Sequence, residues 1–373
     1  MTAFRILRSV FAAGALPSVI LSQPAARDST PVVTLGLFVD GYVAWDRNRP
    51  VPRDRAFTTQ PARHNEFNIN LAHLSLGVEQ SRVRARFTAQ AGTSVQANYA
   101  SEPADGVISG PSVSQHIQEA YVGVQPARNW WIDGGIYLSP IGFESWISLD
   151  NPTYTRSLTA DYTPYYLSGV RATWQASPRV VATLQAVNGW QIISERNDGK
   201  ALVARVDWTA SDAVALGASA FVGEEQPQGD GARARQFGQL LARLTPRSGT
   251  EAWLTVDGGL EDGRDGPTRR WWSLTAIGRQ RLTDAVSLSL RGERYGDPRG
   301  VLIPVGDGRG GPMFTGGSMG FDVRIAGGAL WRTEARYLQA DQRVFPSGAG
   351  ARPTRDNVVV TTSLAFRADH RVR

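Results

Sequence analysis

The stretch from Arg82 to Ala91 alternates without a break between polar and apolar side chains. One phase carries three arginines and the other only apolar residues: Arg82, Arg84 and Arg86 against Val83, Ala85, Phe87, Ala89 and Ala91. A period of two is that of a β-strand with two different faces. Such a strand suits a soluble sandwich, which buries its apolar face, or a membrane barrel, which turns that face to lipid and keeps the polar face inside.

The connections between such runs decide between the two classes. Short turns fall after Glu79 and near residues 125–129, 176–178, 209–212, 246–249, 283–284 and 326–328. Between them lie long polar or Gly-rich segments, after Ala91 and Leu138 and at 191–199, 224–235, 260–268, 297–316 and 339–356. Short turns on one side and long loops on the other are the layout of an outer-membrane barrel, and a soluble sandwich has no reason to keep that alternation.

The alternating runs predict an all-β fold, a closed antiparallel transmembrane β-barrel of about 16 strands (14–18), with short periplasmic turns and long extracellular loops. The strand cores are residues 33–46, 65–79, 82–92, 115–124, 130–138, 165–174, 180–189, 200–208, 213–223, 236–245, 250–259, 269–281, 285–296, 317–325, 329–338 and 357–366. A phase slip near Ala72 and His73 predicts a β-bulge. The last run ends at Phe366 and leaves a basic tail, Arg367 to Arg373, which does not fit a closing strand.

The N-terminus resembles an export signal. Arg5 and Arg8 precede a short apolar core, residues 10–21, and a polar segment follows at residues 22–26. We therefore expect a signal peptide at 1–26 and a single barrel domain at 27–373, with an N-terminal anchor helix as the alternative. The chain of 373 residues has no cysteine, which excludes disulfides and thiolate metal sites. Its mean hydropathy of −0.26 excludes a helical membrane protein.

Aromatic residues gather near the predicted strand ends. They are Trp45, Trp130, Tyr166, Trp174, Trp190, Trp208, Trp272, Trp331 and Tyr337. Interfacial aromatic girdles place tryptophan and tyrosine at those positions, although ordinary β-propensity is an alternative reason.

If the apolar phase faces lipid, the opposite phase lines the lumen. The predicted pore-lining residues are Arg82, Arg84, Arg86, Glu119, Asp133, Arg171, Arg205, Arg291, Arg332 and Arg336. Arginines outnumber acids in this phase, and arginines inside a pore favour anions. The alternative is that these charges pair across strands and merely fill a wet lumen.

The third long loop, residues 139–164, is unusually aromatic for an exposed segment. It carries four charged candidates: Glu144, Asp150, Arg156 and Asp161. Folded inward, its acids would lie opposite the strand with Arg82, Arg84 and Arg86 and produce a constriction with a transverse field. The alternative is an external cap that stabilises the rim.

Other chemistry has little support in the sequence. The four histidines are scattered without metal-ligand spacing, and no G-x-S-x-G or phosphate-binding loop stands in a strand-helix context. We therefore expect no metal, no cofactor and no catalytic residue. We expect no nucleic-acid partner in spite of the net charge of +6, because the basic residues alternate inward and form no outer face.

Several short motifs follow one another between Asn65 and Gln191. They are Asn65-Glu66-Phe67 with Asn70, Gln118-Glu119-Ala120-Tyr121-Val122-Gly123, Asp133-Gly134-Gly135, Ser139-Pro140-Ile141-Gly142-Phe143-Glu144-Ser145, Asp150-Asn151, Tyr154-Thr155-Arg156-Ser157, Pro164-Tyr165-Tyr166, Ser168-Gly169-Val170-Arg171 and Asn188-Gly189-Trp190-Gln191. In these motifs the chain resembles the OmpL-like family of bacterial β-barrel porins. The resemblance implies an outer-membrane barrel with a pore role, and it carries no catalytic residue.

We therefore expect an outer-membrane porin, not an enzyme, that passes small hydrophilic solutes or ions by diffusion and favours anions. The alternative is a non-conducting outer-membrane barrel that acts as an adhesion or structural protein; a barrel hydrolase is a third class. The expected partners are outer-membrane lipid, small hydrophilic solutes and the barrel-assembly machinery. Three copies could associate, but no sequence feature marks an interface.

Overall fold

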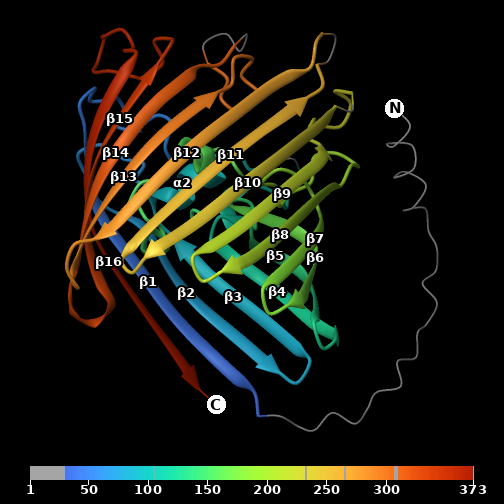
Figure 1. Cartoon of the computed structure of the whole chain (residues 1–373). Coiled ribbons are helices and arrows are strands. Elements are labelled where there is room, and N and C mark those ends of the chain that lie inside the picture. Colours follow the sequence, from blue (N-terminus) through green and yellow to red (C-terminus); the bar gives the residue numbers. More distant parts are fainter. Residues whose placement is uncertain (1–29, 105, 232, 264–265, 306–309, 373) are drawn as a thin grey trace.

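The computed structural model describes residues 30–104, 106–231, 233–263, 266–305 and 310–372. The predicted signal peptide, 1–26, lies outside these residues, as does the start of the predicted domain. Sixteen antiparallel strands close into one barrel, in which every strand pairs with its two sequence neighbours and β1 pairs with β16 (Figure 1). The prediction of a closed barrel of about 16 strands is confirmed. None of the helices in the described part of the chain has the length and hydropathy of a membrane-spanning helix.

All the strands except β7, which has 8 residues, reach the roughly 9–11 residues needed to cross a bilayer when tilted. Their bounds are β1 Val32–Asp46, β2 Phe67–Gln80, β3 Val83–Ala91, β4 Ile117–Ala127, β5 Trp130–Leu138, β6 Tyr166–Ser177, β7 Val180–Val187, β8 Ala201–Ser211, β9 Val214–Glu224, β10 Ala234–Arg247, β11 Thr250–Glu261, β12 Arg269–Arg281, β13 Val286–Gly296, β14 Met313–Arg324, β15 Ala329–Ala340 and β16 Asp356–Val372. Short helices lie in the connections: α2 Thr93–Tyr99, α3 Pro111–Ser114, η1 Ser148–Asp150, α4 Leu158–Asp161 and η2 Ala326–Gly328.

Two local predictions need adjustment. The bulge lies slightly before Ala72, because Asp40 pairs with Leu71 whereas Gly41 pairs with Ile69, which leaves Asn70 as the extra residue. The closing strand does not end at Phe366. It continues to Val372 and pairs with the start of β1, so that the basic segment is part of the barrel wall.

The alternation of faces follows the predicted phase. On β3, Val83 and Phe87 each expose 49% of their surface on the outside of the barrel, whereas Thr88 is fully buried on the inside. An outer surface of exposed apolar side chains is stable only against hydrocarbon. The arrangement therefore requires a lipid environment around the strands.

Most of the predicted girdle aromatics are on this outer surface. Trp45, Trp130, Trp174, Trp208, Trp272, Trp331 and Tyr337 are exposed, and the Trp130 and Trp174 rings stack with their centroids 5.5 Å apart. Two assignments are wrong. Tyr166 is fully buried against Tyr99, and Trp190 packs inside the barrel against Phe221 and Phe237. Both residues belong to the interior packing.

The inside of the barrel is packed most extensively toward the long loops. Near the long loops, a cluster of buried apolar side chains joins the wall to the loops, with Phe221, Phe237, Trp271, Tyr295 and Phe314 on the strands. Near the short turns, inward-facing polar side chains keep contact with solvent: Asp207 and Arg243 each expose 52% of their side chains. The lumen around these two residues is therefore wet, whereas most of the long-loop half is filled by protein.

Candidate pore and its inner loop

The third long loop is an inner loop: residues 139–165 enter the barrel and cross it. It leaves β5 and returns into β6, and every residue from 151 to 161 is buried. The hydroxyl of Thr159, in α4, lies 2.6 Å from that of Ser273 and 2.9 Å from that of Thr275 on β12. Further along the wall, the Ser148 hydroxyl donates to Asp40 of β1 at 2.9 Å. In a ring of sixteen strands, the arc from β12 to β1 lies across the lumen from β5 and β6, so the loop spans the interior.

Two acids of the opposite wall hold the loop through its backbone. Glu334 of β15 accepts from the Thr155 N–H at 2.6 Å and from the Thr155 hydroxyl at 2.9 Å. Glu293 of β13 accepts from the Leu158 N–H at 2.8 Å, at the first turn of α4. Each carboxylate also meets a guanidinium: Arg291 lies 3.0 Å from Glu334, and Arg336 lies 2.8 Å from Glu293. All four charged side chains are almost completely buried.

Arg332 of β15 is the third anchor, and its side chain has no exposed surface. It donates to the backbone carbonyl of Ser148 at 2.5 Å and to that of Asn151 at 3.1 Å. Its other partner is Asp322 of β14, which it meets at 2.9 and 3.1 Å. Asp322 also pairs with Arg279 of β12 at 2.9 Å. The planar guanidinium thus fixes the loop to the wall with directional hydrogen bonds.

A different arginine arrangement lies on the wall from which the loop departs. Arg84 of β3 makes a two-pronged contact with Asp133 of β5, at 2.7 and 2.6 Å, and Arg171 of β6 meets the same carboxylate at 3.0 Å. Asp133 has no exposed side-chain surface, whereas Arg84 exposes 25% and Arg171 18%. One carboxylate therefore serves two guanidiniums that both reach solvent.

Local sequence explains how this cluster fits between the strands. Gly123 of β4 lies between Arg84 and Asp133, and a Cβ atom there would meet the Asp133 carboxylate at 2.1 Å. Aromatic rings support the guanidiniums from the sides. Arg84 lies 4.2 Å from the Trp131 ring centroid, and Arg171 lies 4.4 Å from that of Tyr137. Such contacts fix the orientation of a cation without neutralising it.

Some of the other predicted pore-lining residues are exposed to solvent, and the rest are covered by protein. Arg82 lies in the exposed turn between β2 and β3. Arg86 pairs with Glu119 at 2.5 Å and exposes 36% of its side chain. Arg205 is buried, pairs with Asp207 at 2.5 Å and donates to Ser219 at 3.0 Å. Arg291, Arg332 and Arg336 lie beneath the inner loop, away from open water.

The four charged candidates of the loop point mostly into the loop itself. Glu144 accepts from the backbone N–H of Ser157 at 3.0 Å and from its hydroxyl. Asp161 accepts from the hydroxyls of Thr59 at 2.7 Å and Tyr165 at 2.8 Å. Burial raises the pKa of both carboxyls, and the positive charge of Arg156 partly opposes the shift in each.

The remaining two candidates differ in exposure. Arg156 is buried, donates to the Ala160 carbonyl at 2.8 Å and lies 3.6 Å from the Tyr165 ring centroid. Asp150 is solvent-accessible and pairs with Arg367 of β16 at 2.7 Å. Within the described residues, no ion pair joins any of the four to Arg82, Arg84 or Arg86. The predicted transverse field between the loop acids and those arginines stays a prediction.

Sequence reasoning missed several inward-facing charges, among them Asp322 and Arg367. Asp322 stands between Phe321 and Val323 in an alternating run, so its phase was readable. Arg367 was assigned to a tail after the last strand and was therefore not considered as a lumenal residue.

Comparison with known proteins agrees with this geometry. The family profile "Putative beta-barrel porin-2, OmpL-like" matches residues 32–367, which is most of the chain. A search of curated proteins found no sequence match.

Solved porin structures share the architecture at low sequence identity. An anion-selective porin from Comamonas acidovorans is 12% identical, with a TM-score of 0.57 over 91% of this chain and 100% of that one. The outer membrane channel DcaP of Acinetobacter baumannii is 12% identical, with a TM-score of 0.59 over 90% and 97%. OmpT, an outer membrane protein of Vibrio cholerae in a trimer form, is 8% identical, with a TM-score of 0.56 over 91% and 100%. At these identities the likeness concerns the fold. With the family profile and the closed sixteen-strand barrel together, the chain belongs to the OmpL-like β-barrel porins of the bacterial outer membrane.

Proposed function

We propose that this porin passes small hydrophilic solutes by passive diffusion through the space between the inner loop and the wall formed by β3 to β6. One observation carries the proposal. Arg84, Arg86 and Arg171 on this wall keep solvent contact, whereas Arg291, Arg332 and Arg336 on the opposite wall are covered by the inner loop. Polar side chains around a wet space give ions and small solutes a surface with which to exchange water contacts.

The inner loop, residues 139–165, is the proposed constriction. It occupies the lumen with a buried segment that is fixed to the far wall by Glu293, Glu334 and Arg332. Because Glu144, Arg156 and Asp161 form their hydrogen bonds mainly within the loop, the loop narrows the path by the volume that it occupies and not by these charges. The charges beside the remaining space come from the Arg84 cluster and from the Asp150–Arg367 pair.

A preference for anions is the second part of the proposal. Two guanidiniums, those of Arg84 and Arg171, share the single carboxylate of Asp133, so this cluster carries one positive charge in excess. The neighbouring pair of Arg86 and Glu119 is balanced. A fixed positive charge at a narrow point raises the local concentration of anions and lowers that of cations.

The assembly state is proposed by analogy with the architecture. We propose a homotrimer in outer-membrane lipid, inserted by the barrel-assembly machinery, because OmpT of Vibrio cholerae is described in a trimer form and has a similar barrel. The exposed apolar outer wall offers the surface that a membrane-embedded interface needs.

Planar bilayers test the channel against its alternative, a non-conducting adhesion or structural barrel. Folded chain, checked by its heat-modifiable mobility in gels, should give discrete conductance steps. Replacing residues 143–161 by a short Gly-Ser linker should increase the step size, because the segment that fills the lumen is gone. A matched variant with residues 227–230 of the exposed β9–β10 connection replaced should keep the wild-type step. Folded protein without any current would favour the non-conducting alternative.

A further inference from the structure

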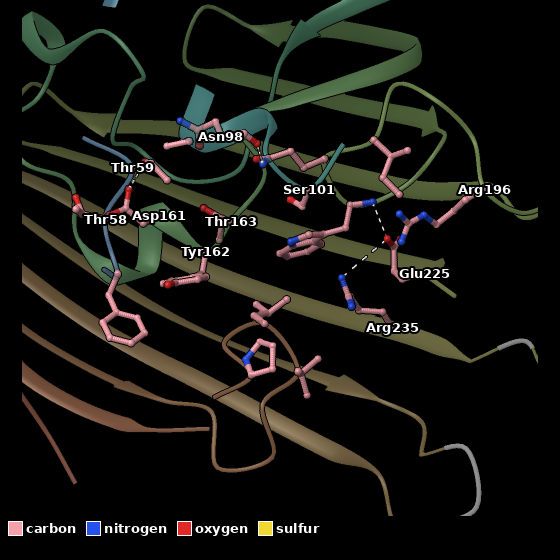
Figure 2. Close-up of a pocket in the computed structure, with 18 residues that line it drawn as sticks. Thr58, Thr59, Asn98, Ser101, Asp161, Tyr162, Thr163, Arg196, Glu225 and Arg235 are labelled. Carbon is pink, nitrogen blue, oxygen red and sulfur yellow. Dashed lines mark hydrogen bonds and ion pairs between the residues drawn. The ribbon is translucent and has the colours of Figure 1, made fainter. Parts of the chain in front are cut away.

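A cavity of about 660 Å³ opens among the long loops, separate from the arginine clusters of the lumen (Figure 2). Its lining comes from six connections and from the adjoining start of β10: Thr59 from the first loop, Asn98 from α2, Tyr162 from the third loop, Trp190 from the fourth, Glu225 from the fifth and Leu302 from the seventh. Its volume is within the usual range for sites that hold small molecules, roughly 300–1,000 Å³. Because all these connections are long loops, the cavity lies toward the outer mouth of the barrel.

Aromatic side chains form part of the apolar lining, and two of them pack against rings of the barrel wall. The Trp190 ring meets Phe221 and Phe237 edge-on, with centroid distances of 4.9 and 5.1 Å. Tyr162 packs against Tyr295 at 5.6 Å. Rings fixed from behind offer a preformed flat surface to a ligand, so binding does not have to order them.

Two acids of the lining each have one buried oxygen that accepts no hydrogen bond from the described residues. Glu225 uses Oε2 to accept from the Trp190 N–H at 3.0 Å, and its Oε1 has no hydrogen-bond partner among the described residues. Asp161 uses Oδ1 for Thr59 and Tyr165, and its Oδ2 has no partner within the same part of the chain. Figure 2 shows the two carboxyl groups toward opposite ends of the cavity. Buried acceptors of this kind call for a donor from water or from a ligand.

The lining also contains a hydrogen-bond donor that a ligand could use. The buried Nε–H of Arg196 has no acceptor within the described residues. Arg196 and Arg235 stand near Glu225 (Figure 2), so the lining contains two guanidiniums and two carboxyls. Formal charges of the lining therefore balance, and neither an anion nor a cation gains a net attraction.

A ligand that satisfies this lining needs donors and acceptors together, no net charge and a flat apolar face. Hydroxyl groups both donate and accept, and the C–H faces of a sugar ring pack on aromatic rings. We propose that the cavity is an entry site for a neutral polyhydroxylated solute of mono- to disaccharide size. The proposal rests on the channel function in one respect only, in that the bound solute is also the one that diffuses onward.

Calorimetric titration of the folded chain in detergent tests the site without any need for conduction. Maltose should give a saturable heat, whereas glutamate, arginine and glycine at equal concentration should not. Glu225→Gln and Asp161→Asn each keep the acceptor that the neighbouring protein donors use and lose the free carboxylate oxygen. Each should weaken maltose binding about tenfold, the usual loss when a hydrogen bond to a charged group is removed.

Glu195→Gln is the matched control. Glu195 lies in the same loop as Trp190 and Arg196, but it pairs with Lys200 at 2.5 Å and is not part of the lining, so its removal should leave maltose binding unchanged. The absence of maltose heat, an equal heat from a charged or zwitterionic solute, or unchanged affinity in both test variants would overturn the proposal. If one test variant fails to fold, the other decides.

Conductance recorded on the same preparation separates the two proposals. A conducting chain that binds no maltose disproves the entry site and leaves the channel intact. A chain that binds maltose and passes no current disproves the channel and leaves the site as a receptor for the same solute.

Discussion

The wall formed by β12 to β15 and the wall formed by β3 to β6 both carry inward arginines, yet they use them in opposite ways. On the first wall, Arg291 and Arg336 face Glu293 and Glu334 under the inner loop, and these four side chains are almost completely buried. On the second, Arg84 and Arg171 share Asp133 and reach water. The difference shows that the position of an arginine in the inward phase does not determine its role. Its role depends on whether the inner loop covers the side chain.

We call the wall of β12 to β15 the covered wall and that of β3 to β6 the open wall. The cost of removing charges from water explains why the covered wall needs matched charges. A guanidinium removed from water costs several kcal/mol unless a carboxylate and further hydrogen bonds replace the water. The loop supplies those hydrogen bonds through the carbonyls of Ser148, Asn151 and Thr155. On the open wall, water supplies them, so an unmatched positive charge is tolerated.

The largest effect should follow from Arg332→Met on the covered wall. The change removes the guanidinium donor from the Asn151 carbonyl and from the Ser148 carbonyl, which keeps only the Asn151 N–H, and it leaves Asp322 with Arg279 alone. Breaking a buried pair of this kind costs about 3–5 kcal/mol. We expect the urea midpoint of the folded barrel to fall accordingly and the loop between β5 and β6 to become sensitive to protease.

The matched change on the open wall is Arg84→Met. Asp133 keeps Arg171, and Arg84 already has solvent contact, so the expected loss is about 1 kcal/mol. Equal losses for the two variants would mean that the covered and open walls do not differ in the way described above.

Next in size is the electrical effect of Arg84→Asp. The substitution changes the local charge by two units beside the proposed path, from an excess of one positive charge to an excess of one negative charge. The reversal potential in a salt gradient should shift toward cations, and the shift should shrink at high salt, because mobile ions screen the fixed charge. Arg63→Asp makes the same charge change in the first loop, where Arg63 pairs with Asp54 and Glu66, and should shift the potential far less. An unchanged potential in Arg84→Asp would contradict a lumenal role for this cluster.

The acid inside the inner loop gives a pH dependence of intermediate size. Burial raises the pKa of Glu144 above the ordinary value of 4.5, although Arg291 and Arg156 oppose the shift. An acid whose pKa is raised by folding stabilises the folded loop below its unfolded pKa, and that contribution is lost as pH rises through the folded pKa. Loop protection from protease should therefore be stronger at pH 4.5 than at pH 8.

Glu144→Gln serves as the test of that cause. The amide keeps an acceptor for the Ser157 N–H and cannot ionise, so the dependence on pH should flatten. A wild-type loop that becomes better protected as pH rises would show that another group, with a lowered pKa, dominates.

The strand pattern was predictable from the sequence because it depends on local alternation. Runs such as residues 82–92 have a lipid face and a water face whichever strand lies beside them, so count, phase and closure followed from period and turn length. The basic segment after Phe366 was misassigned because its alternation is obscured by consecutive polar residues, whereas its pairing with β1 comes from the closure of the ring.

The two walls could not be told apart in the same way. Arg84 and Arg332 have the same local pattern, an arginine between apolar or neutral residues of a strand. Only the path of residues 139–165 covers one and leaves the other open, and that path depends on contacts between residues more than a hundred positions apart, such as Thr155 with Glu334. A loop's aromatic content indicates that it packs, but it does not indicate against which wall.

The smallest expected effect concerns the point where the loop meets open water. Asp150 and Arg367 pair at 2.7 Å with 37% of each side chain exposed, unlike the covered pairs a few residues away. Exposed pairs contribute about 0.2–1 kcal/mol. Asp150→Asn should therefore lower the free energy of unfolding by less than 1 kcal/mol, and a double-mutant cycle with Arg367→Gln should return a coupling of the same size. Since the change removes one negative charge beside the proposed path, anion preference should rise slightly, by less than Arg84→Asp lowers it. A stability loss as large as that of Arg332→Met would place Asp150 among the loop's anchors and move the boundary between the covered and open walls.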